Sequence, residues 1–307
     1  MLSGILSPAF LQEAGRAGKG EKLGTIKLFT QFADPTINSI SCTGEIKVTT
    51  TKNGAPLVQT YSDLSGDTLS ISADKNTEIV ISGAEITACE IGENTDYTKI
   101  SVKNTAITML SCNYCYTLTA LDVSKNTALT TLSCSSCYAL TALDVSKNTA
   151  LTTLDCSNCY ALTALDLSKN TAITELSCDS CSALTALDLS KNTALTTLSC
   201  DSCYALTALD LSKNTAITML SCNYCYTLTA LDVSKNTALT ELGCSNCAKL
   251  VSISYPATNE DVSTAIANAI TAADVADGTV YTDSEGAYYS TIADAATAKG
   301  WTIEQIA

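Results

Sequence analysis

Paired cysteines are the residues of this 307-residue chain whose type and spacing could best support chemistry. Of its 16 cysteines, all but Cys42 and Cys89 fall in C-x-x-C pairs that recur every 22 residues, the first being Cys112 and Cys115. Such pairs can bind a metal, exchange disulfides or form structural bridges. The chain has no histidine, which removes imidazole as a metal ligand and as a general acid or base. Thioredoxin-type chemistry also needs a single pair at the start of a helix, not a periodic series.

The sequence around each pair favours a structural role for the cysteines. The clearest repeat, residues 132–153, reads LSCSSCYALTALDVSKNTALTT, in which Leu132 and Cys134 flank Ser133 as in a short strand with two inward side chains. Each repeat also divides into two similar halves of 11 residues, so that Cys137 aligns with Asn148. We therefore predict buried free thiols that act as small apolar side chains, with no metal site. Bridges between coils are disfavoured because stacked strands lie ~4.8 Å apart, wider than the Cβ–Cβ distance of ~3.8 Å in a disulfide.

A period of 22 residues built on L-x-x-L-x-L-x-x-N/C predicts a leucine-rich-repeat solenoid. The repeats begin at Leu110, Leu132, Leu154, Leu176, Leu198, Leu220 and Leu242. One coil cannot bury its own leucines, but stacked coils share a continuous core. We expect one asparagine per coil to bond backbone groups that the turn leaves unpaired. These asparagines are Asn104, Asn126, Asn148, Asn170, Asn192, Asn214 and Asn236.

The predicted fold class is a mainly β repeat solenoid with a cap at each end, since a repeat array needs its two ends covered. We divide the chain into an N-terminal tail or docking segment (1–23), a β-sandwich-like capping module (24–85), the solenoid (86–252) and a C-terminal α/β cap (253–307). Alternating apolar and polar residues and a turn at Asn53-Gly54 indicate antiparallel strands in the first cap. In the second cap, two helical patterns alternate with the strand patterns TVYTD and WTIEQI, and Trp301 is its expected anchor.

Tyrosines provide the candidate ligand-binding surface. They follow the second cysteine in most repeats, and two more lie between the cysteines. The candidate residues are Tyr114, Tyr116, Tyr138, Tyr160, Tyr204, Tyr224 and Tyr226, and Ser182 interrupts the series. Because the period is one coil, we expect them to line up along one edge, and tyrosine with serine and asparagine is the composition of adaptable binding surfaces. Alternatively, the tyrosines only stack over the turn and stiffen the rod.

The charged residues argue against several other functions. Aspartates such as Asp144 and lysines such as Lys147 recur three residues apart, and we expect them to form screened surface ion pairs, because the lysine breaks the ligand run of a calcium loop. A net charge of −14 without a basic stripe argues against nucleic acid and anionic membrane surfaces, and no segment reaches transmembrane length. No phosphate-binding glycine loop or nucleophile–base motif occurs, so we predict a non-enzymatic protein without a cofactor.

The repeat LTxLxCSxC/N followed by LTALDVSKNTA resembles the cysteine-ladder leucine-rich repeats of internalin-like bacterial surface proteins, and similar arrays occur in gut-bacterial surface proteins. The resemblance covers residues 86–252, although the usual pattern has asparagine where this chain has its second cysteine. It implies a binding or adhesion protein that presents its repeat surface to a protein or glycan ligand, outside the cell or at its surface.

The N-terminal segment supports an alternative. Residues 1–23 contain no recognisable signal peptide, and the chain shows neither a lipobox-like cysteine near its start nor a wall-sorting tail. The alternative is a structural appendage, a fibre or decoration protein, of a phage particle or similar assembly. In that case residues 1–23 dock to other subunits, with Phe10 and Leu11 as the candidate contact residues.

Overall fold

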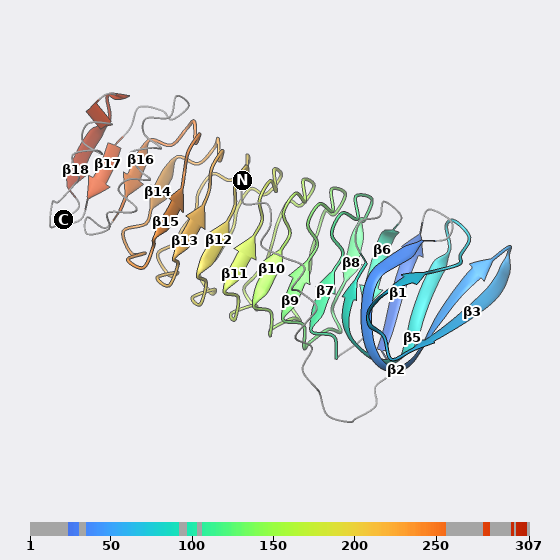
Figure 1. The fold of residues 1–307 in the computed structure, drawn as a ribbon. Coiled ribbons are helices and arrows are strands. Elements are labelled where there is room, and N and C mark those ends of the chain that lie inside the picture. Colours follow the sequence, from blue (N-terminus) through green and yellow to red (C-terminus); the bar gives the residue numbers. More distant parts are fainter. Residues whose placement is uncertain are drawn as a thin grey trace.

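The computed structural model describes residues 24–30, 35–91, 97–102, 106–255, 279–282, 296–297 and 299–305. These residues form an elongated stack of coils, with a β-rich module at the N-terminal end and two short parallel strands at the C-terminal end (Figure 1). Equivalent residues of successive repeats pair with one another, Leu132 with Leu154 and Leu154 with Leu176. The predicted repeat solenoid is therefore confirmed.

The first half of each repeat supplies a short parallel strand. These strands are β7 (Met109–Ser111), β9 (Thr131–Ser133), β10 (Thr153–Asp155), β11 (Glu175–Ser177), β12 (Thr197–Ser199), β13 (Met219–Ser221) and β15 (Glu241–Gly243). Each strand pairs in parallel with the next, and the sheet runs along one side of the stack. The central leucine of a strand points into the coil, and Leu132, Leu154 and Leu176 are at most 1% exposed. They share one interior, as the spacing predicted.

The second half of each repeat returns along the opposite side of the coil (Figure 1). It forms strands β8 (Ala120–Asp122) and β14 (Ala230–Asp232), which pair with β6 (Tyr97–Val102) and β16 (Ser252–Ser254) respectively. Between β8 and β14 this half is extended, and Leu143 and Leu165 still point inward, each 6% exposed. Each coil is thus a flattened loop with two extended sides joined by two turns.

An antiparallel module precedes the stack. Its strands are β1 (Gly24–Thr30), β2 (Thr36–Lys52), β3 (Ala55–Ser62), β4 (Ser65–Ser70) and β5 (Glu78–Glu90). The last residues of β5 pair in parallel with β7, Cys89 opposite Leu110, so the module is continuous with the first coil. Strand β1 pairs with both β5 and β6 and therefore joins the two sides of the solenoid at this end. Asn53 and Gly54 have φ values of 53° and 73°, which confirms the predicted turn between β2 and β3.

At the other end, β17 (Thr279–Thr282) and β18 (Thr302–Gln305) extend the sheet that contains β14 and β16. Val280 and Trp301 are buried and belong to the same core as the coils. Residues 296–297 and 299 are helical, and the remainder of the two helical patterns lies outside the described residues.

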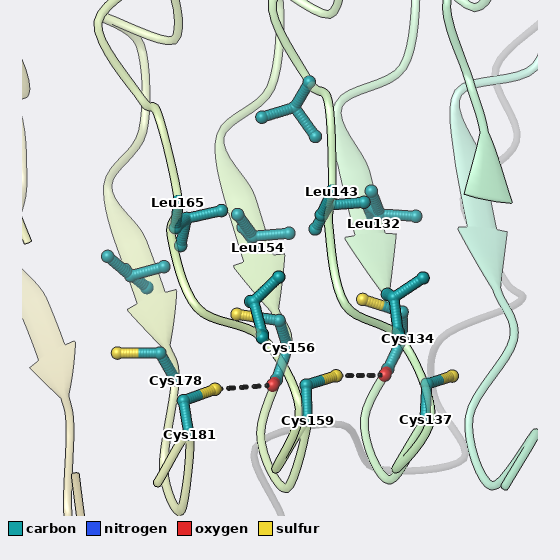
Figure 2. Packing of buried hydrophobic residues seen from close by; sticks show 14 of the residues in the cluster. Leu132, Cys134, Cys137, Leu143, Leu154, Cys156, Cys159, Leu165, Cys178 and Cys181 are labelled. Atoms are coloured by element: carbon teal, nitrogen blue, oxygen red, sulfur yellow. Dashed lines mark hydrogen bonds between the residues drawn. The ribbon is translucent and has the colours of Figure 1, made fainter. Parts of the chain in front are cut away.

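Two ladders of side chains hold the turns of successive coils together. In the cysteine ladder, the second cysteine of each pair donates to the carbonyl oxygen of the first cysteine one coil earlier. Thus Cys159 Sγ lies 3.3 Å from Cys134 O and Cys181 Sγ lies 3.2 Å from Cys156 O (Figure 2). All sixteen cysteines are free and buried. The thiols are therefore packing material that also bonds the backbone, whereas a disulfide would need a different geometry.

In the asparagine ladder, at the opposite turn, each side chain makes two such bonds. Asn170 Nδ2 donates to Val145 O and to Asn148 O, both at 2.9 Å. The same pair of bonds recurs at Asn148, Asn192, Asn214 and Asn236. The predicted bonding is confirmed for these five residues; Asn126 is buried at the same turn, where its predicted bonding stays a prediction, and Asn104 lies outside the described residues. Cys137 and Asn148, which align in the two half-repeats, therefore have the same structural role, because each side chain donates a hydrogen bond to a backbone carbonyl oxygen of the preceding coil.

Candidate binding surface

The turn that follows each cysteine pair places five tyrosines in one row, here called the tyrosine column: Tyr116, Tyr138, Tyr160, Tyr204 and Tyr226. The ring centroids are 4.7 Å apart for Tyr116 and Tyr138 and 4.8 Å apart for Tyr138 and Tyr160, and both pairs are stacked. Tyr204 and Tyr226 stack at 5.1 Å. These distances match the ~4.8 Å between parallel strands, so the coil spacing sets the ring spacing.

The remaining two candidate tyrosines stand at the ends of the column. Tyr114 meets Tyr116, and Tyr224 meets Tyr226, edge to face with ring centroids 6.3 Å apart. The structure therefore brings all seven candidate residues together on one edge, in two groups on either side of Ser182. Whether this edge binds a ligand stays a prediction.

Local backbone geometry explains why the column lies on the outside. The residue just before the second cysteine has a left-handed φ in every coil, for example 59° at Asn158 and 58° at Ser202. Asparagine tolerates this conformation better than most residues, although serine or tyrosine occupies the position in other coils, and the conformation reverses the chain within the pair. The N–H of the residue two positions on then bonds back across the bend, as from Tyr204 to Ser202 O at 2.9 Å. The side chain of the residue after the second cysteine, such as Tyr204, therefore points away from the core.

The stacked rings remain available to solvent. Tyr138 is 39% exposed, Tyr160 45% and Tyr204 44%. Burial, together with Tyr138 and Tyr204, raises the pKa of Tyr160. The column therefore offers aromatic surface for stacking and a row of hydroxyls that can donate or accept hydrogen bonds.

A hydrogen-bonded polar ladder runs beside the column, and the sequence reasoning did not foresee it. Its members are the residues on either side of the first cysteine of each pair. Asp201 Oδ1 accepts from Ser221 Oγ and from the N–H of Asn223, both at 2.7 Å. Burial raises the pKa of Asp179, although Ser199 Oγ donates to its carboxylate at 2.6 Å. The varied Asn, Ser and Asp residues at these positions were the available signal.

The prediction that the repeated aspartates and lysines, such as Asp144 and Lys147, form surface ion pairs was wrong. The two ion pairs of the described residues, Lys27–Glu78 and Lys47–Glu45, both lie in the N-terminal module. Each aspartate instead bonds within its own turn, as where the N–H of Ser146 donates to Asp144 Oδ1 at 2.9 Å. The Ser146 hydroxyl and N–H, with Lys147, hold the pKa of Asp144 below its usual value. A short local bond formed here because the serine is already in reach, whereas the lysine must lose rotamer freedom.

The surroundings of several buried cysteines, Cys134 and Cys89 among them, disfavour the thiolate, whereas the neighbouring Cys222 thiol lowers the pKa of Cys247. The neighbouring Cys159 thiol, followed by burial, raises the pKa of Cys134 well above its usual value. Burial raises the pKa of Cys89 to about 12. Nucleophilic and metal-binding cysteines need the thiolate form, which these surroundings disfavour. Within the described residues, no group of three or more His, Cys, Asp or Glu side chains is placed to hold a metal ion.

Two further sequence predictions concern regions beyond this surface. Phe10 and Leu11, the candidate docking residues, lie outside the described residues. The appendage alternative that depends on them therefore stays a prediction. No helix in the described part of the chain is long and apolar enough to cross a membrane.

The stacked 22-residue coils and the buried thiol series define the class of protein: a leucine-rich-repeat solenoid with a cysteine ladder. Among solved structures, the chain is similar to InlJ from Listeria monocytogenes, whose functional domain includes a cysteine ladder. The two are 28% identical over 61% of this chain and 53% of that chain, with a TM-score of 0.31. The chain thus spans about half the length of the InlJ chain that it matches.

A second similar structure is the internalin InlF from Listeria monocytogenes strain 4b F2365. The identity is 17%, over 72% of this chain and 87% of that chain, and the TM-score is 0.24. No protein-family model matches the chain, and a search of curated proteins finds no match.

Proposed function

We propose that this protein is a non-enzymatic binding or adhesion protein that acts outside the cell or at its surface and presents its tyrosine-bearing edge to a protein or glycan ligand. The observation that carries the proposal is the tyrosine column, whose rings stack at the coil spacing while Tyr138, Tyr160 and Tyr204 stay 39%, 45% and 44% exposed. Tyrosine supplies a large amphipathic contact area with only two side-chain torsions to restrict.

The stacking of the rings on one another supports binding over simple covering of the turn. Each ring is fixed by its neighbours at about the coil spacing, so a ligand does not have to restrict free side chains on association. Immobilising a flexible side chain at an interface typically costs ~0.5–1.5 kcal/mol, and a preformed column avoids most of that cost. The turn itself is already closed by backbone and thiol bonds, such as Leu162 N–H to Cys159 O at 3.0 Å. It does not depend on the rings.

The test is a glycan and protein array screen of the intact chain against a variant in which Tyr116, Tyr138, Tyr160, Tyr204 and Tyr226 are all serine. A matched control carries serine at Thr141, Thr163, Thr185 and Thr207, which are exposed on the opposite side of the coil. We expect the tyrosine variant to lose the hits that the intact chain and the control share, while its circular dichroism spectrum is unchanged. Binding that survives in the folded tyrosine variant would remove the column from the proposed function.

A further inference from the structure

The tyrosine column has one interruption, and its dimensions are those of a missing ring. Tyr160 and Tyr204 lie two coils apart with Ser182 between them, so their rings are about 10 Å apart, twice the strand spacing of ~4.8 Å. Elsewhere in the column that same two-coil interval is filled by an aromatic ring. Tyr138 sits between Tyr116 and Tyr160 with centroid distances of 4.7 and 4.8 Å.

The backbone at the interruption is the same as in the other coils. Ser182 N–H bonds to Ser180 O at 2.8 Å, as Tyr204 N–H bonds to Ser202 O at 2.9 Å. Ser180 has the left-handed φ of 58° that this position has in every coil. The Ser182 hydroxyl donates to Tyr160 O at 3.5 Å, so the side chain lies against the chain. The interruption is therefore a space above a normal turn. Tyr160 and Tyr204, which border it, are somewhat more exposed than Tyr138 within the stack, at 45% and 44% against 39%.

Charge is concentrated at the same place. The cysteine halves of the first six repeats, residues 106–117 and the five equivalent segments up to 216–227, contain no lysine or arginine. The acidic residues of those halves are Asp155, Glu175, Asp179 and Asp201. All four fall in the three consecutive coils that contain Tyr160, Ser182 and Tyr204. The lysines of the second half-repeats, such as Lys169 and Lys191, belong to the turn at the opposite edge, and the seventh cysteine half carries one charge of each sign, Glu241 and Lys249.

We propose that the space above Ser182 is a slot for one aromatic side chain of a protein partner, in which the partner ring stacks between Tyr160 and Tyr204 and basic residues next to it face the surrounding carboxylates. Two stacking faces at the spacing of the column recognise a planar ring, and the acidic surroundings select a cationic flank. This inference rests on the proposed function and names the class of ligand that the tyrosine edge takes.

The probe is the capped tripeptide Lys-Trp-Lys, titrated into the full chain with saturation-transfer NMR on the indole protons, and Lys-Ala-Lys is followed on its methyl protons. Ser182→Tyr completes the column and closes the slot without altering the repeat, and Ser182→Ala is its matched control. We expect Ser182→Tyr to weaken Lys-Trp-Lys binding at least tenfold and Ser182→Ala to stay within twofold of the intact chain. Lys-Ala-Lys is expected to bind at least tenfold more weakly than Lys-Trp-Lys.

A second variant moves the slot. In Ser182→Tyr combined with Tyr138→Ser, the vacant position lies between Tyr116 and Tyr160, and we expect binding of Lys-Trp-Lys to return in part. Equal binding by the intact chain and Ser182→Tyr, or equal binding of the two tripeptides, would overturn the slot. The array screen gives an independent outcome, because ligands lost on removing the tyrosines but retained by Ser182→Tyr would refute the slot and leave the proposed function standing.

Discussion

Replacing Asn170 by alanine tests whether the asparagine ladder, more than the cysteine ladder, holds the coils together. Asn170 is fully buried and donates two hydrogen bonds of 2.9 Å, to Val145 O and Asn148 O. In the cysteine ladder, Cys159 makes one bond of 3.3 Å through a thiol, which is a weak donor. The substitution therefore removes two amide bonds from the asparagine ladder, whereas Cys159→Ala removes one weak bond from the other.

The structure sets the size of the expected loss. Both carbonyl oxygens that Asn170 contacts keep a backbone donor, Asn148 N–H to Val145 O at 2.9 Å and Leu151 N–H to Asn148 O at 3.1 Å. They are not left unsatisfied, so each lost bond costs only its net value of about 1 kcal/mol. Asn170 Oδ1 is buried without a partner, and its removal offsets part of the small cavity that the side chain leaves. We expect Asn170→Ala to lower the free energy of unfolding by about 2 kcal/mol, and Cys159→Ala by about 1 kcal/mol.

The assay is urea unfolding followed by circular dichroism, with Thr171→Ala, at the exposed neighbouring position, as the control. The control is expected to stay within about 0.5 kcal/mol of the intact chain. The slope of free energy against urea must be the same in all variants, since a repeat array can otherwise unfold in parts. If Asn170→Ala costs no more than Cys159→Ala, the two-bond asparagine is not the stronger connection and the reasoning fails.

Three other outcomes follow from the same contacts. Ellman's reagent is expected to leave the ladder thiols of the native protein unmodified and to react with all 16 thiols in guanidinium, and rapid native reaction would contradict their burial. Burial raises the pKa of Cys89 to about 12, so its stabilising effect is complete below the unfolded pKa of ~8.5 and is lost as pH rises toward the folded value. Each thiol with such a raised pKa lowers the free energy of unfolding by up to ~1.4 kcal/mol per pH unit in that window. The urea concentration at the unfolding midpoint should therefore decrease as pH rises from 8 to 10, and a constant midpoint would be inconsistent with this. Because φ at Ser202 is 58°, the Ser202→Val variant should be less stable than the Ser202→Gly variant by about 1–2 kcal/mol in thermal unfolding. Equal stability of the two variants would argue against a strained turn.

The sequence was sufficient for the repeated part of the fold. Leu132, Leu154 and Leu176 share an interior because a fixed period in the chain becomes a fixed translation in space, and any burial requirement is then met in every coil at once. The equivalence of Cys137 and Asn148 was also readable, since only the alignment of the two half-repeats was needed. The row of stacked tyrosines follows from the same period.

Other features could not be predicted because they depend on which partner is nearest in three dimensions. Asp144 bonds to Ser146 in its own turn, although Lys147 offered the opposite charge, and the choice is made by the local backbone conformation. The polar ladder joins residues about one coil apart, and its geometry requires knowing that Ser221 and Asp201 face the same way. Strand β5 serves the N-terminal module and the first coil together, which a division of the chain into consecutive segments does not express.

The two turns of each coil constrain their residues to different degrees, and this difference connects stability with function. In the lysine-side turn, the asparagine donates two bonds to the preceding coil at five successive repeats, from Asn148 to Asn236, so this residue is constrained. The cysteine-side turn is closed by backbone bonds and a thiol contact, so the side chain that follows the second cysteine is not needed to close it. Tyr160, Ser182 and Tyr204 can therefore differ without disturbing the stack. Variation in this chain falls on the cysteine halves of the coils, where outward side chains can change without loss of the shared core, and this is the part of the surface that we propose binds a ligand.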